Sequence, residues 1–338
     1  MSSSDINCGS GGGANTYTGL RIASVFIILA GSGFGALFPV FARRSSWLHV
    51  PEPIYEFAKY FGSGVIIATA FIHLLSSGIT ELSSPCLSPA WQVYPYALAF
   101  SMLSLFCIFV VELVAFRWGT AKLAALGVVH DAHGHGVGSH AAHGPETFDD
   151  KNASARDQTD GSDLEIGNGG PIMDENVLAQ LIGVFILEFG VLLHSLLIGL
   201  TLAVDENFKI LFVVIVFHQL FEGLGIGSRL STLSLSSRYS YIPVLGGVLY
   251  AITTPIGIAA GLGVRSTYNP NSTTASIVSG IMDSLSSGIL LYTGLVELLA
   301  HEFLFNPKMI NASTGKITYA VVCMLFGTGI MALLGRWA

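Results

Sequence analysis

Eight long apolar runs constrain the fold of this chain more than any other feature. A bilayer core about 30 Å thick needs about 20 apolar residues of helix. The whole chain is 51% hydrophobic and only 11% charged, whereas an average soluble domain has roughly 25% charged residues. The sequence therefore predicts an all-α, polytopic integral membrane protein with eight transmembrane helices. The runs are 19–42, 57–80, 91–117, 178–204, 209–229, 241–264, 276–300 and 317–336.

One segment divides these runs into groups of three and five. Residues 119–177 are rich in Gly, Asp, Ser, Asn and His, a composition that cannot bury enough apolar surface to offset chain entropy. We expect a disordered or loosely ordered loop there. The predicted organisation is a polar N-terminal tail (1–18), helices 1 to 3 (19–118), the loop (119–177) and helices 4 to 8 (178–338). The tail has no basic segment followed at once by a short apolar core, so we expect no cleaved signal peptide.

The distribution of Lys and Arg predicts the orientation, because these residues are enriched at the cytosolic ends of membrane helices. With both termini outside, the outer segments keep only Arg21, Lys209, Arg265 and Arg336 of the 15 Lys and Arg residues. The loop is then cytosolic. The net charge of -7 is the sum over an acidic loop and a nearly uncharged membrane portion. Such a charge distribution offers no basic surface, and we expect no nucleic-acid partner.

Two of the four cysteines lie in polar segments. Cys8 and Cys86 fall on the same predicted outer side, so a disulfide between them is possible. Cys107 and Cys323 lie inside apolar runs, where we expect them to pack against neighbouring helices.

Two polar clusters lie inside the apolar second half of the chain, His194-Ser195 in the fourth run and His218-Gln219 with Glu222 in the fifth. A charged side chain at the centre of a spanning helix costs roughly 2.5 to 3.5 kcal/mol on insertion scales, so something should compensate these groups. His218 and Glu222 are four positions apart and share one helix face. A short turn at 205–208 makes the two helices antiparallel neighbours, so His194, His218 and Glu222 can converge near the midplane.

Imidazole nitrogen and carboxylate oxygen together suit a divalent metal ion. Zinc fits such donors, and so do ferrous iron and manganese. Ser195 and Gln219 are predicted neighbours of the ion. The alternative is that the three strong donors only hydrogen-bond one another across the helix pair.

Other polar residues in the apolar runs have two interpretations each. His73 either lines the metal route or is a hydrogen-bonded core group. Glu112 and Glu188 are predicted interhelical hydrogen-bond partners. Glu297 and His301 repeat the spacing of four and form either an exit site or an interfacial ion pair.

Half of the ten histidines gather in the predicted loop. Short His-rich tracts bind metal without needing a fold, so this tract is either a cytosolic metal sensor or buffer, or a flexible spacer. These histidines are His130, His133, His135, His140 and His143.

The two clusters resemble the fourth- and fifth-helix signatures of the ZIP (Zrt-, Irt-like) divalent metal transporters. The segments 250–257 in the sixth run, and 288–290 and 297–300 in the seventh, are similar to the fungal and plant branch. The resemblance implies that His194, His218 and Glu222 are transport ligands. It also implies an inverted repeat of helices 1 to 3 against 6 to 8, helices 4 and 5 as the transport core, and a homodimer. Some members have an acidic residue where this chain has Ile198, so a single metal ion is expected.

The expected function is therefore transport of a divalent cation, zinc first, into the cytosol by alternating access. No ATP-binding sequence of the Gly-Lys-Ser/Thr type is present, and no prosthetic group is expected. The alternative is an intramembrane zinc hydrolase that uses the same donors to activate water, although its usual helical signatures are missing. We expect the plasma membrane as the location, with a vacuolar or other internal membrane as the alternative.

Overall fold

The computed structural model describes residues 8–9, 12, 16–45, 50–125, 175–233, 235 and 239–337. Within these residues the chain is helical and contains no strand. Eight helical spans in the described residues are long and apolar enough to cross a membrane. The predicted fold class is confirmed.

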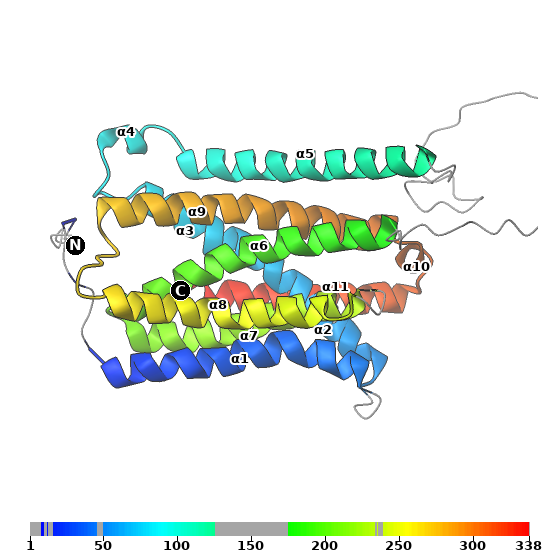
Figure 1. The fold of residues 1–338 in the computed structure, drawn as a ribbon, viewed down its shortest axis with the longest axis horizontal. Coiled ribbons are helices and arrows are strands. Elements are labelled where there is room, and N and C mark those ends of the chain that lie inside the picture. Colours follow the sequence, from blue (N-terminus) through cyan, green and yellow to red (C-terminus); the bar gives the residue numbers. More distant parts are fainter. Residues whose placement is uncertain are drawn as a thin grey trace, which may run out of the picture.

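Six of the eight spans are single α-helices (Figure 1). The second and seventh spans are compound helices. The second consists of α2 (Glu52–Ala68), η1 (Thr69–Leu75) and α3 (Ser76–Leu82), and the seventh of α9 (Thr273–Tyr292) and η3 (Thr293–Phe305). Short helices α4 (Pro89–Gln92) and α10 (Pro307–Ile310) lie in the connections. The single helices are α1 (Thr18–Arg44), α5 (Tyr96–Ala125), α6 (Glu175–Val204), α7 (Phe208–Thr232), α8 (Ile242–Val264) and α11 (Thr314–Leu334).

The segments η1 and η3 are π-helical. Insertion of a π-helical turn into an α-helix changes which side chains face the neighbouring helices, and such turns are frequent at functional sites. η1 contains His73. The two spans that carry these segments are equivalent under the inverted repeat that the family resemblance implies.

The helices around the two polar clusters approach one another at glycines. A Cβ atom at Gly199 of α6 would collide with the carbonyl oxygen of Thr254 on α8, and one at Gly225 of α7 would collide with Gly62 of α2. Small residues allow such close approach in membranes. The sequence predicted α6 and α7 as neighbours. They do touch, but α6 packs mainly on α8, and α7 packs mainly on α1.

The two ends of the chain lie at the same end of the helix bundle, as eight crossings require (Figure 1). α5 ends and α6 begins at the opposite end. These two helices extend into the predicted loop, to Ala125 and from Glu175. The rest of the loop, including its five histidines, lies outside the described residues.

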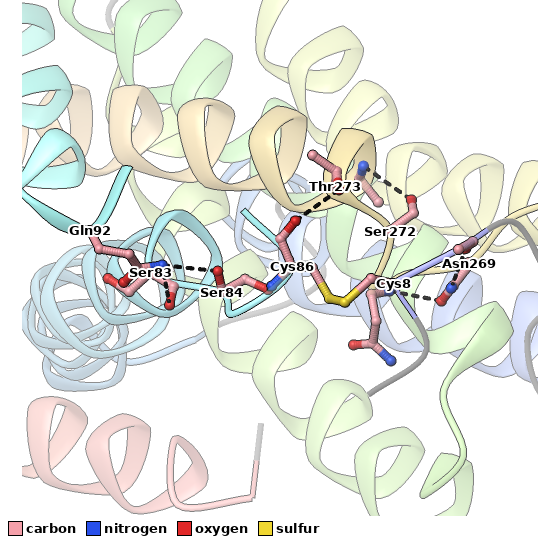
Figure 2. The surroundings of a disulfide bond; sticks show 11 residues. Cys8, Ser83, Ser84, Cys86, Gln92, Asn269, Ser272 and Thr273 are labelled. Atoms are coloured by element: carbon pink, nitrogen blue, oxygen red, sulfur yellow. Dashed lines mark hydrogen bonds between the residues drawn. A yellow bond between two sulfur atoms is a disulfide. The ribbon is translucent and has the colours of Figure 1, made fainter. Parts of the chain in front are cut away.

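A disulfide joins Cys8 to Cys86 (Figure 2). It connects the segment before α1 to the connection between α3 and α4. The hydroxyl of Thr273 at the start of α9 donates a hydrogen bond to the Cys86 carbonyl oxygen at 2.9 Å, and Asn269 Nδ2 donates to the Gly9 carbonyl oxygen at 2.7 Å. The pairing that the sequence left open is therefore present, and together with the two hydrogen bonds it links three segments at one end of the bundle.

A buried arginine fastens α1 to the turn between α6 and α7 at the same end. Arg21 is 1% exposed, and its guanidinium donates hydrogen bonds to the carbonyl oxygens of Thr16, Leu202 and Asp205 at 2.7, 3.0 and 2.6 Å. The guanidinium also lies 4.5 Å from the centre of the Phe208 ring. Arg21 thus supplies donors to carbonyl groups at the end of α6 that have no partner within the helix.

Candidate metal-binding site

The two polar clusters meet in the interior of the bundle. His194 on α6 and His218 and Glu222 on α7 are 3%, 1% and 0% exposed. The ring centres of His194 and His218 lie 5.7 Å apart, and His218 Nε2 is 3.7 Å from Glu222 Oε2. The structure thus places His194 beside His218, and His218 beside Glu222.

His73 joins this group from η1. Its ring centre is 4.7 Å from that of His218. Its Nε2 atom is 3.1 Å from the carbonyl oxygen of Met331 on α11. His73 is therefore a hydrogen-bonded core group that lies next to His218, and its place on the metal route stays a prediction.

Several donor atoms at the site are buried without a hydrogen-bond partner. They are His194 Nε2, Ser195 Oγ, both ring nitrogens of His218, and Glu222 Oε1. A buried polar atom without a partner costs about 1 to 3 kcal/mol, so such atoms are rare in folded proteins. Their concentration at one place argues against the alternative in which these side chains merely satisfy one another. Imidazole nitrogens and a carboxylate oxygen are also the donors that zinc takes.

These donors do not form a closed coordination shell. Among the described residues, no three His, Cys, Asp or Glu side chains are arranged as a complete group that could hold a metal ion. An ion at this place would have to draw the donors inward or keep part of its water shell.

A tyrosine and a threonine on α8 orient the α7 side chains. The Tyr250 hydroxyl donates a hydrogen bond to Gln219 Oε1 at 2.7 Å and lies 3.4 Å from Glu222 Oε2. Gln219 Nε2 donates to Thr254 Oγ1. The amide of Gln219 is thus fixed between two α8 hydroxyl groups, and its oxygen shares its lone pairs with Tyr250. Tyr250 and Thr254 were not predicted as site residues, although two polar residues four positions apart in an apolar helix can be recognised in the sequence.

A carboxylate on α9 faces His194 and was also missed. Asp283 is 5% exposed, and its Oδ1 atom is 3.4 Å from His194 Nδ1. Its Oδ2 atom accepts a hydrogen bond from Ser77 Oγ of α3 at 3.0 Å. The sequence contained an indication of this contact, because an acidic residue in an apolar run needs a partner.

The remaining predicted polar residues lie elsewhere. The Tyr292 hydroxyl donates a hydrogen bond to Glu112 Oε2 at 2.7 Å, so the predicted interhelical role of Glu112 is confirmed. Glu188 Oε1 is buried without a partner, so the predicted hydrogen bond is missing at this oxygen. His301 is exposed, and its ring packs against Phe305. An exit role for His301 and Glu297 stays a prediction.

Comparison with known proteins agrees with these observations. The family described as "ZIP Zinc transporter" matches residues 18–335, which include all eight spans. This chain belongs to the ZIP family. Its members are transporters and not enzymes, in agreement with the expectation for this chain.

Relatives within the ZIP family resemble nearly the whole chain. Zinc-regulated transporter 1 of Saccharomyces cerevisiae is 42% identical over 96% of this chain and 90% of its own length. Zinc-regulated transporter 1 of Schizosaccharomyces pombe is 38% identical over 100% of this chain and 90% of its own length. Zinc transporter 3 of Arabidopsis thaliana is 33% identical over 96% of this chain and 86% of its own length. The resemblance to the Schizosaccharomyces pombe protein extends over the whole chain, and therefore over the helices that carry the candidate site.

Proposed function

We propose that this protein carries zinc across a membrane into the cytosol, and that His194, His218 and Glu222 bind the ion on its way. The observation that carries the proposal is the cluster of unpaired nitrogen and oxygen atoms buried between α6 and α7. The names of the relatives support zinc as the substrate. Ser195, Gln219 and His73 flank the ligands, and Ile198 favours a single ion.

The incomplete ligand set suits the transport step. A hydrated ion exchanges some of its waters for the two imidazoles and the carboxylate, and it keeps other waters as ligands. A structural zinc site with four protein ligands holds its metal as part of the fold, so a site with fewer ligands releases the ion more readily. A change in helix packing then closes access from outside and opens access to the cytosol. The zinc gradient and the membrane potential supply the driving force.

The proposed orientation has two independent supports. Disulfides persist in oxidising compartments, so the bond between Cys8 and Cys86 supports an outer location for this end of the bundle. The Lys and Arg bias supports the same assignment. We place the protein in the plasma membrane with outward termini, and the family resemblance supports a homodimer. The His-rich segment would then buffer metal in the cytosol.

The test is uptake of radiolabelled zinc by cells that lack their own zinc importers. Cells expressing the wild type are compared with cells expressing His218→Ala at matched surface levels, with iron and manganese as competitors. We expect saturable uptake by the wild type and loss of uptake in the variant. As a control, Lys308→Ala changes an exposed residue outside the site and should retain most of the uptake.

Two other outcomes would contradict the proposal. A correctly inserted wild type that takes up no zinc but retains one zinc ion per chain through purification would favour the intramembrane hydrolase. Cytosolic zinc that rises only when an internal store is loaded would move the protein to an internal membrane.

A further inference from the structure

Asp283 is a buried carboxylate that the transport ligands do not include. It lies on α9, whereas His194 lies on α6 and His218 and Glu222 lie on α7. Its two oxygens have separate partners, His194 Nδ1 at 3.4 Å and the Ser77 hydroxyl at 3.0 Å. The serine therefore holds one oxygen and leaves the other to face the imidazole.

The contact with Asp283 distinguishes the two nitrogens of His194. Nδ1 faces a carboxylate, which accepts hydrogen bonds and cannot donate one when it is ionised. The proton of a neutral His194 ring therefore belongs on Nδ1. The lone pair is then on Nε2, which is the ring nitrogen without a partner in the structure. In this tautomer one nitrogen is anchored by the carboxylate and the other has a lone pair free to bind a metal ion.

We propose that Asp283 is a positioning residue that fixes the orientation and tautomer of His194 so that Nε2 faces the transported ion, with Ser77 orienting the carboxylate. This proposal rests on the function proposed above. Carboxylates that hold metal-binding histidines in this way strengthen metal binding, and their loss typically costs about 10- to 100-fold in affinity or activity. Asp283 acts through His194 and does not itself bind the ion.

Binding of zinc to the purified, full-length protein in detergent tests the proposal without depending on transport. Asp283→Asn keeps the shape of the side chain and removes its charge. It also introduces an amide that can donate to Nδ1 and so favour the wrong tautomer. We expect zinc to bind about 10- to 100-fold more weakly. In uptake assays the half-saturating zinc concentration should rise by a similar factor, with the maximal rate changed less than the affinity.

The matched control is Ser284→Ala. Ser284 adjoins Asp283, is 0% exposed, and donates its hydrogen bond within α9 to the Gly280 carbonyl oxygen at 2.6 Å. We expect its zinc affinity to match that of the wild type within about twofold, since it does not contact His194. Ser77→Ala should give an intermediate loss of affinity, because the carboxylate stays but loses its orienting hydrogen bond.

A double variant separates positioning from direct binding. If Asp283 acts only through His194, then Asp283→Asn should weaken zinc binding no further in a His194→Ala background. If Asp283→Asn weakens zinc binding in the His194→Ala background by the same factor as in the wild type, then Asp283 binds the ion directly. That result would overturn the proposal. Unchanged affinity in a folded Asp283→Asn variant would also overturn it.

Failure of this inference can be distinguished from failure of the proposed function. If the wild type transports zinc and His218→Ala does not, but Asp283→Asn behaves as the wild type, then only the positioning role is wrong. If the wild type neither binds nor transports zinc, then the proposed function is wrong. If Asp283→Asn fails to fold, the zinc affinity of Ser77→Ala is the test instead. An affinity equal to that of the wild type in Ser77→Ala would contradict the proposal.

Discussion

Several charged groups outside the candidate site are paired, whereas several donor atoms within it are not. Arg21 satisfies three carbonyl oxygens at one end. Lys59 Nζ lies 2.6 Å from Glu302 Oε1, and Lys316 Nζ lies 2.5 Å from Glu56 Oε1. By contrast, His194, Ser195, His218 and Glu222 have buried atoms without partners. The paired groups stabilise the fold, and the unpaired groups are available to a ligand.

The largest effect is expected for Glu222→Gln, which should abolish zinc uptake and leave the fold intact. Glu222→Gln keeps the size of the side chain and replaces a fully buried carboxyl group with a neutral amide. Zinc uptake should fall to background, because the amide is a poor metal ligand, while the free energy of unfolding should change little, because the amide oxygen can still accept from the Tyr250 hydroxyl. Uptake and thermal unfolding in detergent measure the two effects. Loss of uptake caused by unfolding would contradict the comparison.

The opposite result is expected for Arg21→Ala. This variant leaves the carbonyl oxygens of Thr16, Leu202 and Asp205 without a donor. Hydrogen bonds to charged groups contribute about 1.5 to 3 kcal/mol each. Because burial of the guanidinium costs part of that sum, we expect a net loss of about 3 kcal/mol in the free energy of unfolding. The uptake rate per folded molecule should stay close to that of the wild type.

Lys209→Ala serves as the control for Arg21→Ala. It removes an exposed cation near the same turn and should change the free energy of unfolding by less than about 1 kcal/mol. Equal effects of the two variants would mean that general charge, and not the three hydrogen bonds, stabilises this end of the bundle.

Tyr292→Phe should convert a paired carboxyl group into an unpaired one. Glu112 loses its hydroxyl donor, and we expect the protein to be less stable by about 1 kcal/mol, with uptake unchanged. Chemical unfolding in mixed micelles gives the difference. A fall in uptake without a fall in stability would place Glu112 on the metal route.

The smallest effect is expected at the exposed pair of Lys316 and Glu56. The Lys316 side chain is 43% exposed, and exposed ion pairs contribute about 0 to 1 kcal/mol. Lys316→Ala should therefore lower the free energy of unfolding by less than about 1 kcal/mol, and added salt should reduce the difference further. A larger loss of free energy of unfolding that salt does not reduce would show that this exposed pair stabilises the protein as much as the buried contacts do.

The sequence predicted much of this arrangement. The eight spans follow from hydropathy, because the bilayer sets their length. His194, His218 and Glu222 could be found because imidazoles and carboxylates are conspicuous in apolar helices. Their proximity followed from the spacing of four and the short turn.

Other features could not be predicted from the sequence. Hydropathy does not show which helix face meets which neighbour, so the packing of α6 on α8 and of α7 on α1 was missed. The π-helical segments depend on a local change of hydrogen-bond register that composition does not record. The disulfide was left open because two cysteines on one side of a membrane need not be close. Asp283 was overlooked, and only the structure shows that it faces His194.

The most direct test of the central claim is zinc flux into proteoliposomes that contain only the purified protein and a zinc gradient. We predict saturable flux without ATP for the wild type, and background flux for Glu222→Gln inserted at equal density. Equal flux through the two proteins would contradict the claim, because the ion would then cross without using the buried donors of α6 and α7.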